Sequence, residues 1–166
     1  RHILADGSLL LDQTRNGGII SPVSLLLEGV VGSGKTALAA DLALMSNFPL
    51  IKLCSADQMV GFTEIAKCHY LKEVFDDACK SELSCLVIDN IERILEYVSI
   101  GPRFSNSVLQ TLMVLLNKRL PNNHKLLVIG TTSCVSIMEE MGITQIFTRT
   151  LNVPQITDIK EIETVV

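Results

Sequence analysis

The sequence has 166 residues, a length typical of one domain with a sizeable core. Hydrophobic residues make up 48% of it and charged residues 19%, which argues against a disordered chain and favours a sheet covered on both faces. The formal net charge of −4 argues against nucleic acid or an anionic membrane as the main partner. No apolar run approaches the roughly 18 residues of a membrane span, so we expect no direct membrane insertion.

Strand-like and helix-like stretches alternate along the chain. VSLLLEG, residues 23–29, is a short apolar run closed by glycine and predicts a buried strand, followed by an amphipathic helix at residues 35–47. Ser105 or Asn106 is suited to cap a later helix. The remaining pattern predicts strands at 49–55, 84–90, 125–133 and 149–154, helices at 63–81 and 105–120, and a short helix at 136–142.

Strands with continuous apolar runs, alternating with helices, are typical of a parallel sheet with helices on both sides, and so of an α/β fold. Residues 1–22 contain the turn signals DG and NGG, and we expect them to form a lead-in arm. The α/β domain is expected to span residues 23–154. Residues 155–166 are predicted to start a further helical connection.

Five cysteines are scattered along the chain without any C-x-x-C pair: Cys54, Cys68, Cys79, Cys85 and Cys134. This odd, unpaired set indicates free thiols in a reducing compartment, and neither a disulfide framework nor a zinc site. The opening RHILADGSLL lacks the basic, apolar and small-residue sections of a signal peptide. The sequence therefore predicts a cytoplasmic protein.

A complete phosphate-loop pattern, G-x-x-x-x-G-K-[ST], lies between the first predicted strand and helix as GVVGSGKT, residues 29–36. Its glycines permit backbone torsions and a close approach that a Cβ would prevent, and its N–H groups surround a phosphate at a helix N-terminus. Lys35 would reach the β- and γ-phosphates, and Thr36 would offer its hydroxyl to Mg²⁺. The alternative, a plain glycine turn, is disfavoured by the rarity of the full pattern in this context. The predicted ATP-binding residues here are Gly29, Gly32, Ser33, Gly34, Lys35, Thr36 and Ala37.

The stretch CLVIDN, residues 85–90, brings an aspartate to the end of a buried strand. Asp89 is predicted to hold Mg²⁺ through water, and an ordinary strand-end aspartate is the alternative. The next residue, Asn90, is an amide and cannot accept a proton from water. A general base is typically worth about 10²–10⁴-fold in rate. Asn90 is therefore a degenerate version of a water-activating position.

Longer segments around these motifs resemble the second ATPase domain of the N-ethylmaleimide-sensitive fusion proteins, which are vesicle-fusing ATPases of the AAA+ class. The similarity is carried by SNFPLIKLCSADQMVGFTEIAKC, FDDACKSELSCLVIDNIERILEYVSIGPRFSN and KLLVIGTTS, and extends from DGSLLLDQT to LNVP. The resemblance implies a three-layer P-loop NTPase with a five-stranded parallel sheet of order 5-1-4-3-2. It implies ATP and Mg²⁺ as cofactors, and a helical lid beyond the connection at residues 155–166.

The resemblance also implies partners and a location. Vesicle-fusing ATPases are homo-hexamers that act with soluble attachment adaptor proteins to disassemble SNARE complexes. They work in the cytoplasm, peripherally associated with transport vesicles and Golgi-type membranes.

Catalytic parts of active relatives are altered in this sequence. The resemblance places Asn90 where a glutamate is usual, Thr132 where the first sensor is commonly an asparagine, and Arg149 on the fifth strand, where it is expected to be structural and not an arginine finger. We therefore predict a domain that binds Mg-ATP to hold the hexameric ring together, with weak or no hydrolysis. An actively hydrolysing ring is the alternative, and a signalling GTPase is disfavoured because no N/T-K-x-D motif is present.

Four other residues have two readings each. Glu92 could replace the missing base if the strand continued, but IERILEY predicts a turn into a helix, which makes Glu92 a surface or interface residue. Met59 and Phe62 lie where ring ATPases place a pore-facing loop, although both could instead pack beneath that loop. Arg103 could contact a neighbouring subunit or only a backbone partner.

Overall fold

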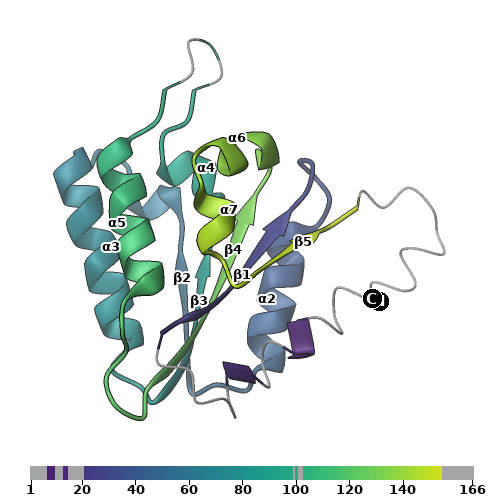
Figure 1. Cartoon of the computed structure of the whole chain (residues 1–166), viewed down its shortest axis with the longest axis vertical. Helices are drawn as coiled ribbons and strands as arrows, with labels where there is room; N and C mark the ends of the chain where they lie inside the picture. The colour runs from purple at the N-terminus through teal and green to yellow at the C-terminus, as the bar shows by residue number, and fades with distance from the viewer. Residues whose placement is uncertain (1–6, 10–12, 15–20, 99, 101–102, 155–166) are drawn as a thin grey trace.

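The computed structural model describes residues 7–9, 13–14, 21–98, 100 and 103–154 (Figure 1). The predicted lead-in arm is thus described only in part, and the predicted connection at residues 155–166 lies outside the described residues. The elements in chain order are β1 (Val23–Glu28), α2 (Lys35–Met45), β2 (Leu50–Cys54), η1 (Ala56–Met59), α3 (Glu64–Ala78), β3 (Leu83–Ile88), α4 (Ile91–Ile94), α5 (Asn106–Asn117), β4 (Lys125–Thr132), α6 (Val135–Glu140), α7 (Ile143–Ile146) and β5 (Arg149–Asn152).

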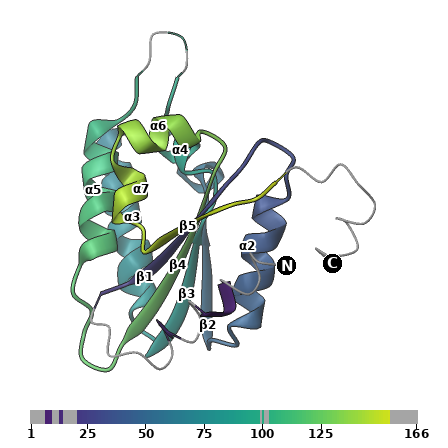
Figure 2. The ribbon, with the colours of Figure 1, turned by 45° about the vertical axis from the view of Figure 1, so that its right-hand side comes forward.

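The five strands form one parallel sheet of order β2-β3-β4-β1-β5. Read from the other edge this is 5-1-4-3-2, so the predicted fold class is confirmed. α3 and α5 cover one face of the sheet and α2 covers the other, as the two views of Figures 1 and 2 show. Among the described residues, no helix combines the length and the apolar character needed to cross a bilayer.

Burial on both faces explains the continuous apolar strands. In the interior strand β1, Leu26 packs into the core layer that contains α3 and α5, whereas Leu25 and Leu27 pack into the layer that contains α2. Successive side chains of a strand point to opposite faces, so a strand covered on both sides has no position for a solvated residue. Val23 to Leu27 are accordingly all buried.

The structure refines the predicted boundaries. The side chain of Ser105, and not Asn106, caps α5 by accepting a hydrogen bond from Val108 N at 3.4 Å. α3 ends at Ala78, three residues before the predicted end. Gly142, with φ 76°, separates α6 from α7, which the sequence pattern did not predict because four residues carry no helical periodicity.

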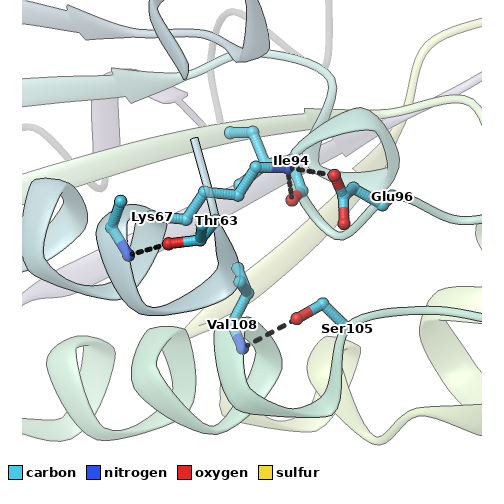
Figure 3. A network of polar contacts seen from close by, with 7 residues as sticks. Thr63, Lys67, Ile94, Glu96, Ser105 and Val108 are labelled. Carbon is cyan, nitrogen blue, oxygen red and sulfur yellow. Dashed lines mark hydrogen bonds and ion pairs between the residues drawn. The ribbon is translucent and has the colours of Figure 1, made fainter. Parts of the chain in front are cut away.

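A buried lysine ties α4 to α3 (Figure 3). Lys67 of α3 is only 5% exposed, and its Nζ donates a hydrogen bond to the backbone oxygen of Ile94 at 3.3 Å. The same ammonium group lies 3.0 Å from Glu96 Oε1. Because α4 begins two residues after Asp89, this contact helps to fix the chain that leaves the tip of β3.

Candidate nucleotide-binding site

All strands are parallel, so the chain segments that follow them meet at one edge of the sheet. At this edge lies an open pocket of about 550 Å³, a size within the usual range for small-ligand sites. It is formed by the phosphate loop, the start of α2, the segment after β3 and the segment after β4. The lining residues are Val31, Gly32, Gly34, Lys35, Thr36, Ala37, Asn90, Glu92, Arg93, Ser133 and Cys134.

Three glycines give the phosphate loop its shape. Gly32 and Gly34 have φ values of 83° and 88°, in the left-handed region that side chains other than asparagine rarely adopt. A Cβ at Gly29 would lie 2.5 Å from the backbone oxygen of Val153 and 2.9 Å from Ser33 Oγ. The loop therefore requires glycine at two positions for torsion and at one for space.

Lys35 lies buried against its own loop. The residue is 6% exposed, and its Nζ donates a hydrogen bond to the backbone oxygen of Val30 at 2.9 Å. This contact holds the ammonium group at the pocket wall beside the start of α2. A positive charge at that point, with the N-terminal N–H groups of an 11-residue helix, favours a phosphate ligand.

The Asp89 carboxylate is held by three side-chain donors. Thr36 Oγ1 donates to Asp89 Oδ1 at 2.9 Å, and Thr131 Oγ1 donates to the same oxygen at 2.7 Å. Asn90 Nδ2 donates to Asp89 Oδ2 at 3.2 Å. The structure thus brings together Thr36 and Asp89, the two residues predicted to serve Mg²⁺.

The donor set fits magnesium. Mg²⁺ takes oxygen ligands and usually keeps several waters, so one hydroxyl and one carboxylate acting through water meet its needs. Within the described part of the chain, no group of three or more His, Cys, Asp or Glu side chains could hold a metal ion. A metal that demands a dedicated protein cage therefore has no site among these residues.

Thr132, the predicted sensor residue, is fully buried and does not line the pocket. Its hydroxyl accepts a hydrogen bond from Cys134 N at 3.1 Å, so its sensor role stays a prediction. The hydroxyl that contacts Asp89 belongs to Thr131, which also accepts from Asn90 N at 2.8 Å. Strand alternation could have found it, because odd-numbered positions of β3 and β4 face α2 together.

Glu92 lies on α4, after the predicted turn, and its partly exposed side chain lines the pocket; an interface role for it stays a prediction. Its Oε1 accepts a hydrogen bond from Ser133 N at 3.2 Å, and its Oε2 is buried. The reason is the turn at Asn90, whose φ of 50° redirects the chain from β3 into α4 and swings residue 92 back toward the loop after β4. Burial chiefly, and then the negative charge of Glu92, raise the pKa of the Cys134 thiol, whereas Lys35 lowers it.

A comparison with protein families identifies the family that has this fold and phosphate loop. The family described as ATPases associated with various cellular activities (AAA) matches residues 25–155.

The chain belongs to the AAA family.

Several vesicle-fusion proteins are similar to this AAA domain. It is 46% identical over 164 residues to the vesicular-fusion protein sec18 of Schizosaccharomyces pombe and 48% identical over 153 residues to the vesicle-fusing ATPase of Arabidopsis thaliana. It is 44% identical over 163 residues to SEC18 of Saccharomyces cerevisiae. These alignments cover 99%, 92% and 98% of this chain, but only 21%, 21% and 22% of the relatives. The chain therefore corresponds to one domain of such proteins, and the predicted resemblance is confirmed.

The loop after β2 of the AAA domain combines packed and exposed side chains. Met59 is buried in the core, which agrees with the packing alternative for this residue. Phe62 is 38% exposed, and its ring lies edge-on to that of Tyr70 with the centroids 5.8 Å apart. A pore-facing role for Phe62 stays a prediction.

Neither predicted arginine lines the pocket of the AAA domain. Arg103 has an exposed side chain, and its backbone exchanges hydrogen bonds with Val98 at 3.0 and 3.3 Å. Arg149 lies on β5, as predicted. The arginine that does line the pocket is Arg93, whose Nη2 also lies 3.4 Å from Asp57 Oδ1. No sequence motif marked Arg93, because its position depends on the turn into α4.

Proposed function

We propose that this chain is the second ATPase domain of a vesicle-fusing ATPase, and that it binds Mg-ATP mainly to hold a hexameric ring together. The observation that carries the binding proposal is the 2.9 Å hydrogen bond from Thr36 to Asp89, because it joins the phosphate loop to the predicted magnesium acid. In this proposal the loop N–H groups and Lys35 bind the phosphates. Thr36 and, through water, Asp89 hold Mg²⁺, which when bound neutralises charge on the β- and γ-phosphates.

Weak or absent hydrolysis is the second part of the proposal. Asn90 can orient water but cannot deprotonate it, and its amide nitrogen is already engaged by Asp89 at 3.2 Å. Thr132 is the proposed sensor-like residue, although its hydroxyl faces Cys134 N. Arg149 is expected to be structural. A pocket with intact binding groups and altered catalytic groups favours a domain that retains its nucleotide.

Retained nucleotide would stabilise the ring by mass action, because a ligand that binds only the assembled state shifts the equilibrium toward it. In the complete protein we propose that the other ATPase ring supplies the force. The proposed targets are SNARE complexes, reached through soluble attachment adaptors, in the cytoplasm at transport vesicles and Golgi-type membranes. The names of the relatives and the family membership support this assignment.

One observation favours the alternative, an actively hydrolysing ring that contributes force to SNARE-complex disassembly. Glu92 is a carboxylate in the nucleotide pocket, and a carboxylate is what position 90 lacks. The two functions differ in turnover and not in binding.

The assembly proposal is tested with the full-length protein by size-exclusion chromatography and light scattering, with and without ATP and magnesium. We expect a ring that needs nucleotide and that Lys35→Ala abolishes. The control is Lys72→Ala, because Lys72 is an exposed residue of α3 that does not line the pocket. A ring whose formation ignores both nucleotide and Lys35→Ala contradicts the proposal.

A further inference from the structure

Two buried side-chain oxygens lack a hydrogen-bond partner among the described residues: Ser33 Oγ in the phosphate loop, and Glu92 Oε2 on a side chain that lines the pocket. A buried polar atom without a partner costs about 1–3 kcal/mol, and more when the group is charged. Such atoms are rare in folded proteins, and a catalytic role or a bound water commonly explains them. The carboxylate oxygen is the more costly of the two and needs the stronger reason.

The position of Glu92 is held from several sides. Ser133 N fixes its Oε1 at 3.2 Å. The helix that carries it, α4, is tied to α3 where Lys67 Nζ donates to Ile94 O at 3.3 Å. Arg93 pairs with Asp57 of η1 at 3.4 Å. The unpartnered oxygen thus belongs to a carboxylate that is anchored through its other oxygen, and the same side chain lines the pocket that Lys35 and Thr36 also line.

The other acid at this site is already engaged. Both oxygens of Asp89 accept hydrogen bonds from protein side chains: Oδ1 from Thr36 and Thr131, and Oδ2 from Asn90. Glu92 is the only acidic residue among those that line the described pocket, and one of its oxygens lacks a protein donor. Oε2 itself is buried in this structure, so a water that enters with the nucleotide satisfies it only after the carboxylate rotates about its contact to Ser133 N.

We propose that Glu92 is the carboxylate that serves the attacking water in this pocket, in place of the amide at position 90. This inference rests on the proposed nucleotide binding and adds the residue responsible for whatever hydrolysis the domain performs. The water oxygen forms a bond to the γ-phosphorus, and the bond from that phosphorus to the bridging oxygen breaks, so that ADP leaves with the electron pair. One water proton passes to Glu92 Oε2 and then to the released phosphate.

The geometry separates this role from a structural one. A glutamine at position 92 keeps an oxygen that can accept from Ser133 N, but it cannot take a proton. Glu92→Gln therefore preserves the contact to the loop after β4 and removes only the proposed chemistry. Glu92→Ala removes both.

The test is single-turnover ATP hydrolysis by the full-length hexamer, with the phosphate-loop lysine of its other ATPase domain replaced. We expect Glu92→Gln and Glu92→Ala each to lower the rate by about 100-fold or more, the range of a lost general base. We expect the dissociation constant for Mg-ATP to change less than about threefold in Glu92→Gln. The matched control is Glu140→Gln, an exposed glutamate of α6 outside the pocket, which should match the wild type.

Each outcome is decisive. A Glu92→Gln rate equal to that of the wild type, or loss only in Glu92→Ala, assigns Glu92 a structural role and overturns the inference. Wild-type protein that binds Mg-ATP without measurable hydrolysis also overturns it, while the proposed binding function stands. Wild-type protein that binds no Mg-ATP at this site defeats the proposed function itself.

Discussion

The buried contact between Lys67 and α4 can be tested by replacing the lysine with methionine, which keeps much of its length and apolar volume. Lys67→Met removes the donor that lies 3.3 Å from Ile94 O and 3.0 Å from Glu96 Oε1. A hydrogen bond to a charged group is typically worth about 1.5–3 kcal/mol. Removing one partner of a buried ion pair costs more when the other stays buried, but the Glu96 side chain is 55% exposed and can regain water.

Lys67→Met also removes the cost of burying an ammonium group. We therefore expect the free energy of unfolding to fall by about 2 kcal/mol. Urea unfolding followed by circular dichroism should show a midpoint lower by about 1 M, and the melting temperature should fall by about 4–8 °C. The control is Lys72→Met on the exposed side of the same helix, which should change little. Lys67→Met protein as stable as the wild type would refute the reasoning, because it would mean that the carbonyl needs no ammonium donor.

Three further predictions follow from single contacts. Gly29→Ala places a methyl group 2.5 Å from the Val153 oxygen, so it should lower the free energy of unfolding by about 1–3 kcal/mol, measured by thermal melting, and weaken Mg-ATP binding. An unchanged melting temperature and affinity would contradict the close approach. Hydrogen bonds from Lys80 and Lys52 hold the pKa of Asp77 below its ordinary value of 3.8. The contribution of Asp77 to the stability of the folded state is therefore present above pH 3.8 and is lost as the pH falls through the lower pKa of the folded state. Asp77→Asn should therefore lower the melting temperature slightly at neutral pH and not in strong acid, and an equal difference at both would argue against the pairs. Cys134 lines the pocket, so Mg-ATP should slow its alkylation, measured by mass spectrometry, and should leave the alkylation rate of Cys68 unchanged. The buried thiols of Cys54 and Cys85, whose pKa values are raised to about 12, should stay unlabelled. Equal alkylation rates for Cys134 with and without nucleotide would argue against binding there.

Fold and phosphate loop were predictable because their signals are local. Apolar runs and helical periodicity identified the five strands and the long helices, and the glycine positions at 29, 32 and 34 follow from the motif. Thr131 was within reach of the same reasoning, since alternation along β4 puts it on the Asp89 face. The resemblance points to Thr132 as the sensor residue, and that role stays a prediction.

Glu92 and Arg93 could not be predicted, for a different physical reason. Both lie on α4, a helix of four residues, which is too short for a periodic pattern to show which way its side chains point. Their direction is set by one torsion at Asn90 and by the contacts that hold α4 from outside. A single turn residue and tertiary contacts together therefore complete the pocket.

Asn90 both supplies the amide side chain beside Asp89 and forms the left-handed turn between β3 and α4. Asparagine tolerates its φ of 50° and ψ of 66°, whereas most other side chains there are disfavoured by about 1–2 kcal/mol. A glutamate at residue 90 would thus strain the backbone turn that orients residue 92. A substitution at residue 90 would therefore change two properties of the site together, the side chain at the strand tip and the backbone turn that orients the carboxylate two residues later.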